Sequence, residues 1–310
     1  MKSKKTHLLQ LASFFLAGVA VFFVGKALWE HKAAILDSIT LAQFLTISLG
    51  GGTIYLVGNF SLAFSWDRLL KWLGENSVHS KDNFLIYGRT QILKYIPGNF
   101  FSIPGRHILS HQKGIGHSPL IGSATLEIIG LLVASSLISI TGIMLTTEQK
   151  VWVSVPVILS IFLLALLSPV ILKKLHKLFF LFQKLTVFKQ ITQGSYFKLL
   201  KIWSSYLFFF LLTGVILWWV IVVIDSPKGN LPVSILFSAY ATSWILGFIT
   251  PGAPAGAGVR EGVMILMLST YMGNPKSILV VVLMRVVTMI GDVLFYVISL
   301  SFRVQPVRKK

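Results

Sequence analysis

Seven apolar stretches of at least 20 residues recur along the chain, and none of them carries more than two charged side chains. An α-helix rises 1.5 Å per residue, so about 20 such residues cross the roughly 30 Å hydrocarbon layer of a membrane. An eighth stretch, of eleven residues, follows a Gly- and Pro-rich run and predicts a short or broken span. We therefore expect an all-α polytopic membrane bundle of about eight spans, at residues 8–29, 41–66, 118–142, 151–172, 202–224, 231–250, 262–272 and 278–302.

The composition supports a membrane protein. Hydrophobic residues make up 55% of the 310 residues and charged residues only 12%, and the mean hydropathy is +0.78. Charged residues make up about a quarter of an ordinary soluble domain. The chain contains no cysteine, which excludes disulfides, thiolate metal sites and cysteine nucleophiles.

The net charge of +18 is distributed unevenly between alternate connecting segments. One set of segments holds 21 Lys and Arg, whereas the alternate set holds four. Because Lys and Arg in short loops stay on the cytoplasmic side, the pattern predicts eight spans with both termini cytoplasmic. Topology and attraction to anionic lipid headgroups therefore explain the basic excess better than nucleic-acid binding does. The basic segments are residues 1–7, 67–117, 173–201 and 303–310.

Two segments are neither plain spans nor plain loops. Residues 84–110 are too apolar for a solvated loop and too charged for a lipid-facing helix, and residues 249–272 begin with a Pro- and Gly-rich run after a span. Each is predicted to break, the first into a helix, a break and a second short helix. Irregular backbone at membrane depth needs burial or a wet cavity, so both breaks are site candidates. The breaks are formed by Pro97, Gly98 and Asn99, and by Pro251, Gly252, Gly256 and Gly258.

The two breaks share a spacing. Each Pro-Gly pair is followed, nine residues after its proline, by an arginine, Arg106 in the first case and Arg260 in the second. Paired interrupted segments in two halves are often the visible trace of a transporter repeat, so a weak repeat of residues 1–172 and 202–310 is one interpretation and a chance match the other. The repeat hypothesis predicts that the two breaks approach each other in space.

The run from Pro251 to Glu261, the earlier KYIPGN sequence at residues 94–99 and Arg285 in the last span resemble a known family. This family is the flippase-like transmembrane domain of lysylphosphatidylglycerol synthases and their stand-alone YbhN/AglD-type relatives. The resemblance covers nearly the whole chain, as one domain, and implies a plasma or inner membrane protein that moves lipids or lipid-linked sugars between leaflets. It also associates the chain with polysaccharide assembly. No aminoacyl-transferase domain follows before Lys310, so lysine transfer to lipid is not expected.

Six ionisable residues lie in or beside the spans, where each costs several kcal/mol unless it is paired or hydrated. We expect them to line one polar cavity, in which the planar guanidinium groups capture a phosphate headgroup. Arg285 and Asp292 are seven residues apart, about 10 Å along one side of a helix, so each needs a partner from elsewhere. The alternative is that these charges form internal ion pairs that fix helix register. The six are Arg106, Arg260, Arg285, Glu127, Glu261 and Asp292, with Asn99 as a further substrate-binding candidate.

We expect no cofactor and no metal. His107 and His111 are four residues apart with His117 nearby, but no carboxylate completes a ligand set, so these are predicted to be interfacial histidines. The expected function is translocation of an anionic lipid or a polyprenyl-phosphate-linked glycan precursor rather than catalysis. Two alternatives stay open: a membrane-embedded transferase with Glu127 or Glu261 as general base, and a scaffold for envelope glycosyltransferases.

Overall fold

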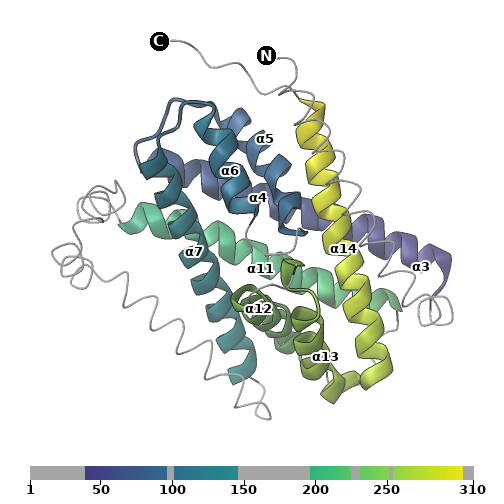
Figure 1. Cartoon of the computed structure of the whole chain (residues 1–310). Coiled ribbons are helices and arrows are strands. Elements are labelled where there is room, and N and C mark those ends of the chain that lie inside the picture. Colours follow the sequence, from purple (N-terminus) through teal and green to yellow (C-terminus); the bar gives the residue numbers. More distant parts are fainter. Residues whose placement is uncertain (1–38, 96–100, 146–195, 225–230, 251–253, 303–310) are drawn as a thin grey trace.

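The computed structural model describes residues 39–95, 101–145, 196–224, 231–250 and 254–302 (Figure 1). Every regular element within these ranges is helical, which confirms the predicted all-α fold class. Four helices there are long and apolar enough to cross a membrane. The predicted spans at residues 8–29 and 151–172 lie outside the described residues.

The long helices match predicted spans. The first is built from α3 (Leu41–Leu45), a π-helical turn η1 (Thr46–Gly50) and α4 (Gly51–Trp72), which together run for 32 residues. Large apolar side chains such as Val57 on α4 remain exposed, as expected of helices that face lipid. The other three are α7 (His117–Met144), α11 (Tyr196–Ile224) and α14 (Asn274–Ser301).

Shorter helices flank the two predicted breaks. The first segment forms α5 (Ser80–Gln91), a 3₁₀ turn η2 (Ile92–Tyr95) and α6 (Ser102–His111), which confirms the helix and the second short helix, whereas the predicted break between them lies outside the described residues. The second forms α12 (Val233–Ile249), a 3₁₀ turn η4 (Pro254–Gly256) and α13 (Val259–Met272). At 14 residues, α13 rises about 21 Å, less than the hydrocarbon thickness.

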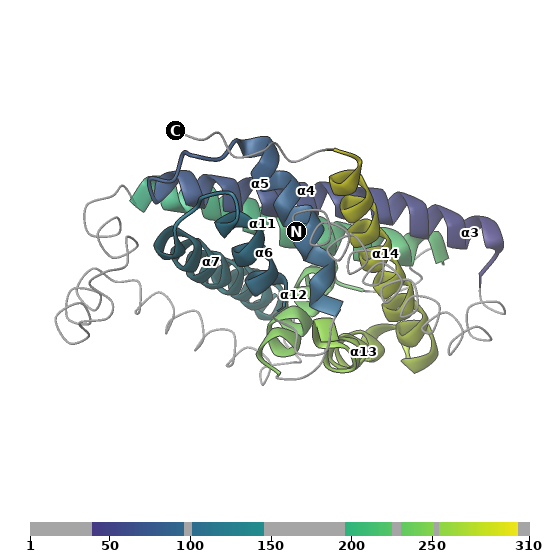
Figure 2. The same cartoon turned by 45° about the horizontal axis from the view of Figure 1, so that its top comes forward.

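Two long helices, α4 and α11, pack along each other, and α14 packs against α4 (Figures 1 and 2). Helix α12 packs against α7, α11 and α13 (Figure 1). Helix α14 approaches α4 so closely at Gly291 that an added Cβ there would lie 2.9 Å from the carbonyl oxygen of Gly52. Small residues that bring backbones together in this way are typical of helix contacts in membranes.

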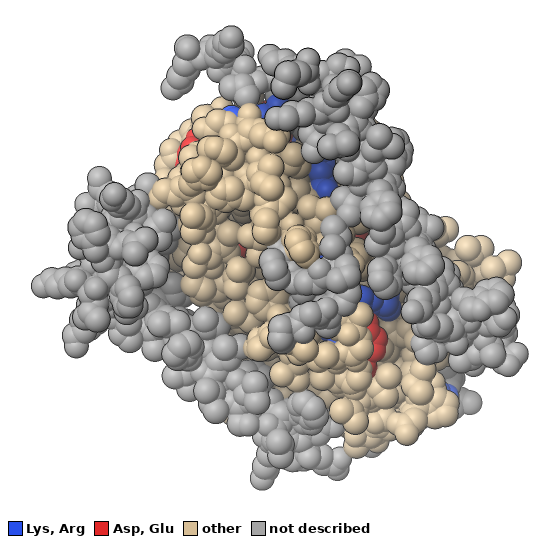
Figure 3. All heavy atoms as spheres, viewed as in Figure 1, with Lys and Arg blue, Asp and Glu red and all other residues tan. Residues whose placement is uncertain are grey.

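Charged side chains reach the described surface in Figure 3 only as small patches on an otherwise uncharged face. Several of the intramembrane charges are instead inside the bundle, including Asp292, which is completely buried. Their partners therefore come from neighbouring helices rather than from solvent, and these partners define the candidate site.

Candidate functional site

Arg260 lies on the first turn of α13, and glycines on both sides make room for its side chain. A Cβ added to Gly247 of α12 would lie 2.4 Å from Cγ of Arg260, and one added to Gly256 would lie 2.7 Å from its Nε. Gly256 also has a φ of 72°, which L side chains rarely adopt. The Arg260 side chain thus fits between α12 and η4 because the residues on either side of it, Gly247 and Gly256, have no side chains.

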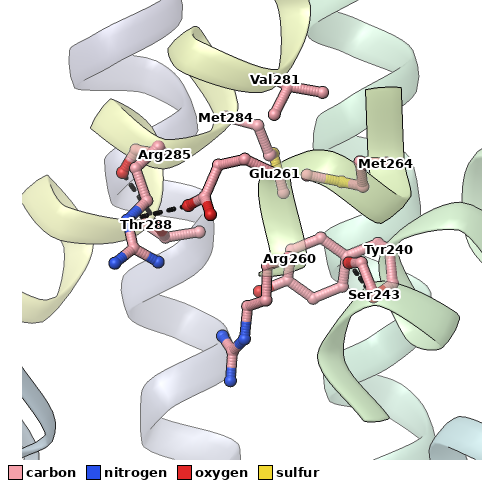
Figure 4. A pocket seen from close by; sticks show the side chains of 9 residues that line it. All are labelled: Tyr240, Ser243, Arg260, Glu261, Met264, Val281, Met284, Arg285 and Thr288. Carbon is pink, nitrogen blue, oxygen red and sulfur yellow. Dashed lines mark hydrogen bonds and ion pairs between the residues drawn. The ribbon is translucent and has the colours of Figure 1, made fainter. Parts of the chain in front are cut away.

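The guanidinium group of Arg260 is held by an aromatic face. Its Cζ lies 5.7 Å from the ring centroid of Trp244, within the range of a cation–π contact. Its Nε is buried and has no hydrogen-bond partner among the described residues. Figure 4 shows the guanidinium group pointing away from Glu261. A buried donor without a partner is costly, so this group is suited to receive an anion.

Arg285 of α14 is loosely paired. Its Nε lies 3.4 Å from Oε1 of Glu261, and its Nη1 donates to the carbonyl oxygen of Ala255 at 3.4 Å. Both distances are long for hydrogen bonds, so neither contact fixes the guanidinium group firmly. The other carboxylate oxygen of Glu261 accepts the backbone N–H of Gly258 at 2.6 Å and so caps the start of α13.

Both arginines and Glu261 line one cavity between α12, α13 and α14 (Figure 4). Hydroxyl-bearing residues, Tyr240 and Ser243 of α12 and Thr288 of α14, also line it, together with apolar side chains. Its volume of about 20 Å³ is enough for a water molecule and far too small for a lipid headgroup. A headgroup can therefore enter only if the surrounding segments move apart.

A second charged cluster surrounds Asp292 of α14. Lys94 Nζ lies 2.7 Å from Oδ2 of Asp292, and the hydroxyl of Tyr95 donates to the same oxygen at 2.7 Å. Asn59 of α4 donates to Oδ1 at 3.0 Å. Three donors, one of them the cation Lys94, thus satisfy this buried carboxylate. The cluster joins η2, α4 and α14 just before the first break.

A third cluster pairs Arg106 of α6 with Glu127 of α7. The two side chains meet through Nη2 and Oε2 at 2.6 Å and through Nη1 and Oε1 at 3.1 Å, and the hydroxyl of Tyr87 donates to Oε1 at 2.7 Å. The Arg106 Cζ lies 4.3 Å from the ring centroid of Tyr87 and 5.0 Å from that of Trp66. A bidentate ion pair and two aromatic rings thus hold this guanidinium group.

The expectation of one cavity shared by all six charges is wrong. Arg106 lines a separate pocket with Trp66 and His107, and that pocket shares no lining residue with the cavity of Arg260 and Arg285. Arg106 projects from α6, whose helix neighbours are α5 and α7, whereas Arg260 projects from α13 towards α12. The interpretation as internal ion pairs therefore fits Arg106 and Glu127.

The segments beside the two breaks approach each other, as the repeat hypothesis requires. Ile92 and Tyr95 of η2 pack in one buried cluster with Ala255 of η4. The Cζ of Arg285 also lies 5.8 Å from the ring centroid of Tyr95. This proximity does not test repeat ancestry itself. The break residues Pro97, Gly98, Asn99, Pro251 and Gly252 lie outside the described residues.

The three histidines gather at the corner between α6 and α7. Nε2 of His107 lies 2.8 Å from Nδ1 of His117, and the rings of His111 and His117 stack at 4.0 Å between centroids. Burial and the two neighbouring rings lower the pKa of His107 below its usual value. Among the described residues, no group of three His, Asp or Glu is arranged to hold a metal ion.

The pairings of Asp292 show what the sequence pattern did not reveal. The missed partners come from two places on the chain, the adjacent Lys94 and Tyr95 and the distant Asn59, which is 233 residues away from Asp292. The signal in the sequence for this pairing was a basic residue, Lys94, three positions before Pro97. Trp244 was also missed, because an aromatic residue in an apolar span looks like any other core residue.

No protein-family model matches the chain, and no curated protein matches it either.

Proposed function

We propose that the chain binds the headgroup of an anionic lipid, or of a polyprenyl-phosphate-linked glycan precursor, and moves it between membrane leaflets. The binding site is the cavity between α12, α13 and α14, and the headgroup is held by Arg260 and Arg285. The protein works in the plasma or inner membrane with both termini cytoplasmic, as the distribution of Lys and Arg predicts. The resemblance to flippase-like transmembrane domains agrees with this proposal.

One observation carries the proposal. Arg260 has a buried Nε without a hydrogen-bond partner among the described residues, whereas Arg106 is bound to Glu127 through two nitrogens. An arginine beside a glycine-rich break, held by an aromatic ring, keeps its donor fork available for phosphate oxygens.

The small size of the cavity supports translocation by alternating exposure. The 20 Å³ cavity excludes a headgroup in this conformation, so the cavity has to open for loading and release. The segments best placed to move are those beside the breaks, because η2 and η4 pack against each other and both adjoin charged residues of the site. Short irregular segments at helix ends absorb backbone rotation during such changes.

The experiment is leaflet exchange in liposomes. Purified protein is reconstituted with acyl-labelled fluorescent phosphatidylglycerol, and quenching of the outer leaflet reports the exchange rate. Wild type is expected to exchange the lipid, and Arg260→Gln is expected to lose most of that activity. Lipids are then extracted and analysed. A new lipid species would support the transferase alternative, and neither exchange nor product would support a scaffold.

A further inference from the structure

We infer that the cavity of Arg260 and Arg285 selects a group with a single negative charge, a phosphodiester, over a doubly charged phosphomonoester or a diphosphate. This inference rests on the proposed function and specifies which anion the site takes.

The charged side chains that line the cavity are two arginines and one carboxylate. Arginine stays protonated in proteins. Glu261 counts as a carboxylate because the groups at its two oxygens, Arg285 and the N–H of Gly258, are both donors. The empty cavity therefore carries a formal charge of +1.

The neighbouring charged groups do not change this balance. Lys94 and Asp292 form a pair at 2.7 Å, and Arg106 and Glu127 form another pair at 2.6 Å, so each pair is neutral as a unit. The undescribed segments at the two breaks, residues 96–100 and 251–253, contain no ionisable side chain. Neither of these two pairs therefore adds a net charge beside the cavity.

Net charge matters here because three helices enclose the cavity and leave its charged side chains little solvent: those of Arg285 and Glu261 are 15% and 25% exposed. An unmatched charge in a low-dielectric interior is far more costly than in water. A phosphodiester brings one negative charge and neutralises the cavity. A phosphomonoester at pH 8 brings two, since its second pKa is about 6, and would leave one charge unmatched.

The geometry fits such a group as well. Arg260 supplies an unpartnered Nε–H donor, and the long contacts of Arg285 allow its guanidinium group to turn towards a ligand. Ser243 of α12 and Thr288 of α14 line the same cavity, and because their hydroxyls donate to backbone carbonyls of their own helices, their oxygens can accept hydrogen bonds from headgroup hydroxyls. Glu261 remains between the arginines as the group that sets the charge.

The test compares two lipids with identical labelled acyl chains, phosphatidylglycerol and phosphatidic acid, bound to the full chain in neutral detergent at pH 8. Energy transfer from the protein's tryptophans measures binding. Wild type is expected to prefer phosphatidylglycerol by about tenfold, which corresponds to 1.4 kcal/mol. At pH 5, where phosphatidic acid carries one charge, the preference should disappear. Equal or tighter binding of phosphatidic acid at pH 8 would overturn the inference.

Glu261→Gln adds a second test, because it raises the charge of the cavity to +2 while glutamine can still accept the N–H of Gly258. The preference should then move towards phosphatidic acid. Glu75→Gln makes the same change of net charge in the loop after α4, and its preference should stay that of wild type. If Glu261→Gln folds but keeps the wild-type preference, the inference fails.

Two further arms separate this inference from the proposed function. Arg260→Gln should weaken binding of both lipids; if binding depends on Arg260 without any charge preference, the proposed function stands and the inference falls. If neither lipid depends on Arg260, the proposed function fails. Competition with soluble dimethyl phosphate should be weak. Displacement as effective as that by unlabelled phosphatidylglycerol would indicate a site for free anions and would contradict a lipid site.

Discussion

Nη2 of Arg106 lies 2.6 Å from Oε2 of Glu127, and the two side chains are only 7% and 5% exposed. The two hydrogen bonds of this ion pair link α6 to α7, and Arg106 lines a different pocket from that of Arg260. Arg106 and Arg260, which each follow a Pro-Gly pair at the same sequence spacing, thus have different environments. Arg106 binds a carboxylate through two nitrogens, whereas Arg260 has an unpartnered nitrogen beside an aromatic ring.

Removal of Arg106 should therefore destabilise the fold. Arg106→Ala leaves Glu127 buried without its cation, a change that costs roughly 3–5 kcal/mol. Thermal unfolding of the purified protein in detergent measures the effect. The double variant Arg106→Met with Glu127→Leu should recover part of the loss, because no buried charge is left unpaired. A double variant less stable than Arg106→Ala would contradict this role.

Tyr95→Phe should also destabilise the protein, by about 1.5–3 kcal/mol, because the buried Asp292 carboxylate loses a charge-assisted hydrogen bond. Tyr271, near the end of α13, is partly exposed. Tyr271→Phe also removes a tyrosine hydroxyl and serves as the matched control. Unfolding temperatures of the two variants decide the question. Equal temperatures for both would show that the Tyr95 hydroxyl does not support the cluster.

Gly247→Ala should displace the side chain of Arg260 without unfolding the protein. The new Cβ would lie 2.4 Å from Cγ of Arg260, so this side chain has to move away from Trp244. We expect leaflet exchange to fall about tenfold, as for a binding loss of 1.4 kcal/mol. Gly262→Ala, where a Cβ meets nothing within 4 Å, is the control and should exchange lipid at the wild-type rate.

The histidine corner predicts a pH dependence of stability. The pKa of His107 is lowered in the folded protein by burial and by His117 and His111, so the unfolded chain binds the proton more readily. Stability is therefore retained above the ordinary histidine pKa of about 6.5 and falls as the pH drops below it. Unfolding temperatures from pH 8 to pH 5.5 should decline more steeply for wild type than for His107→Gln. Parallel declines would rule out this contribution.

The sequence predicted the helices better than it predicted their contacts. Span positions follow from apolar length, which acts locally, and four described helices coincide with predicted spans. The need of Arg285 and Asp292 for separate partners also followed from helix geometry, and the structure gives them Glu261 and Lys94.

Which charges share a cavity depends instead on the rotation and packing of whole helices. Arg106 and Arg260 look equivalent in the sequence, yet the first turns towards α7 and the second towards α12. The role of Trp244 depends on its distance from Arg260 across the second break, and no periodic pattern encodes that distance. The length of the apolar stretches therefore identified the helices, and only the tertiary structure distinguished the candidate site from the ion pairs.

The most direct test of the account is the leaflet-exchange rate of phosphatidylglycerol with three residues at position 260. Arginine should be fastest, Arg260→Lys intermediate because it keeps the charge but loses the planar fork, and Arg260→Gln slowest. All three proteins should be folded and equally reconstituted. Equal rates for arginine and glutamine at this position would contradict the proposal that Arg260 holds the headgroup.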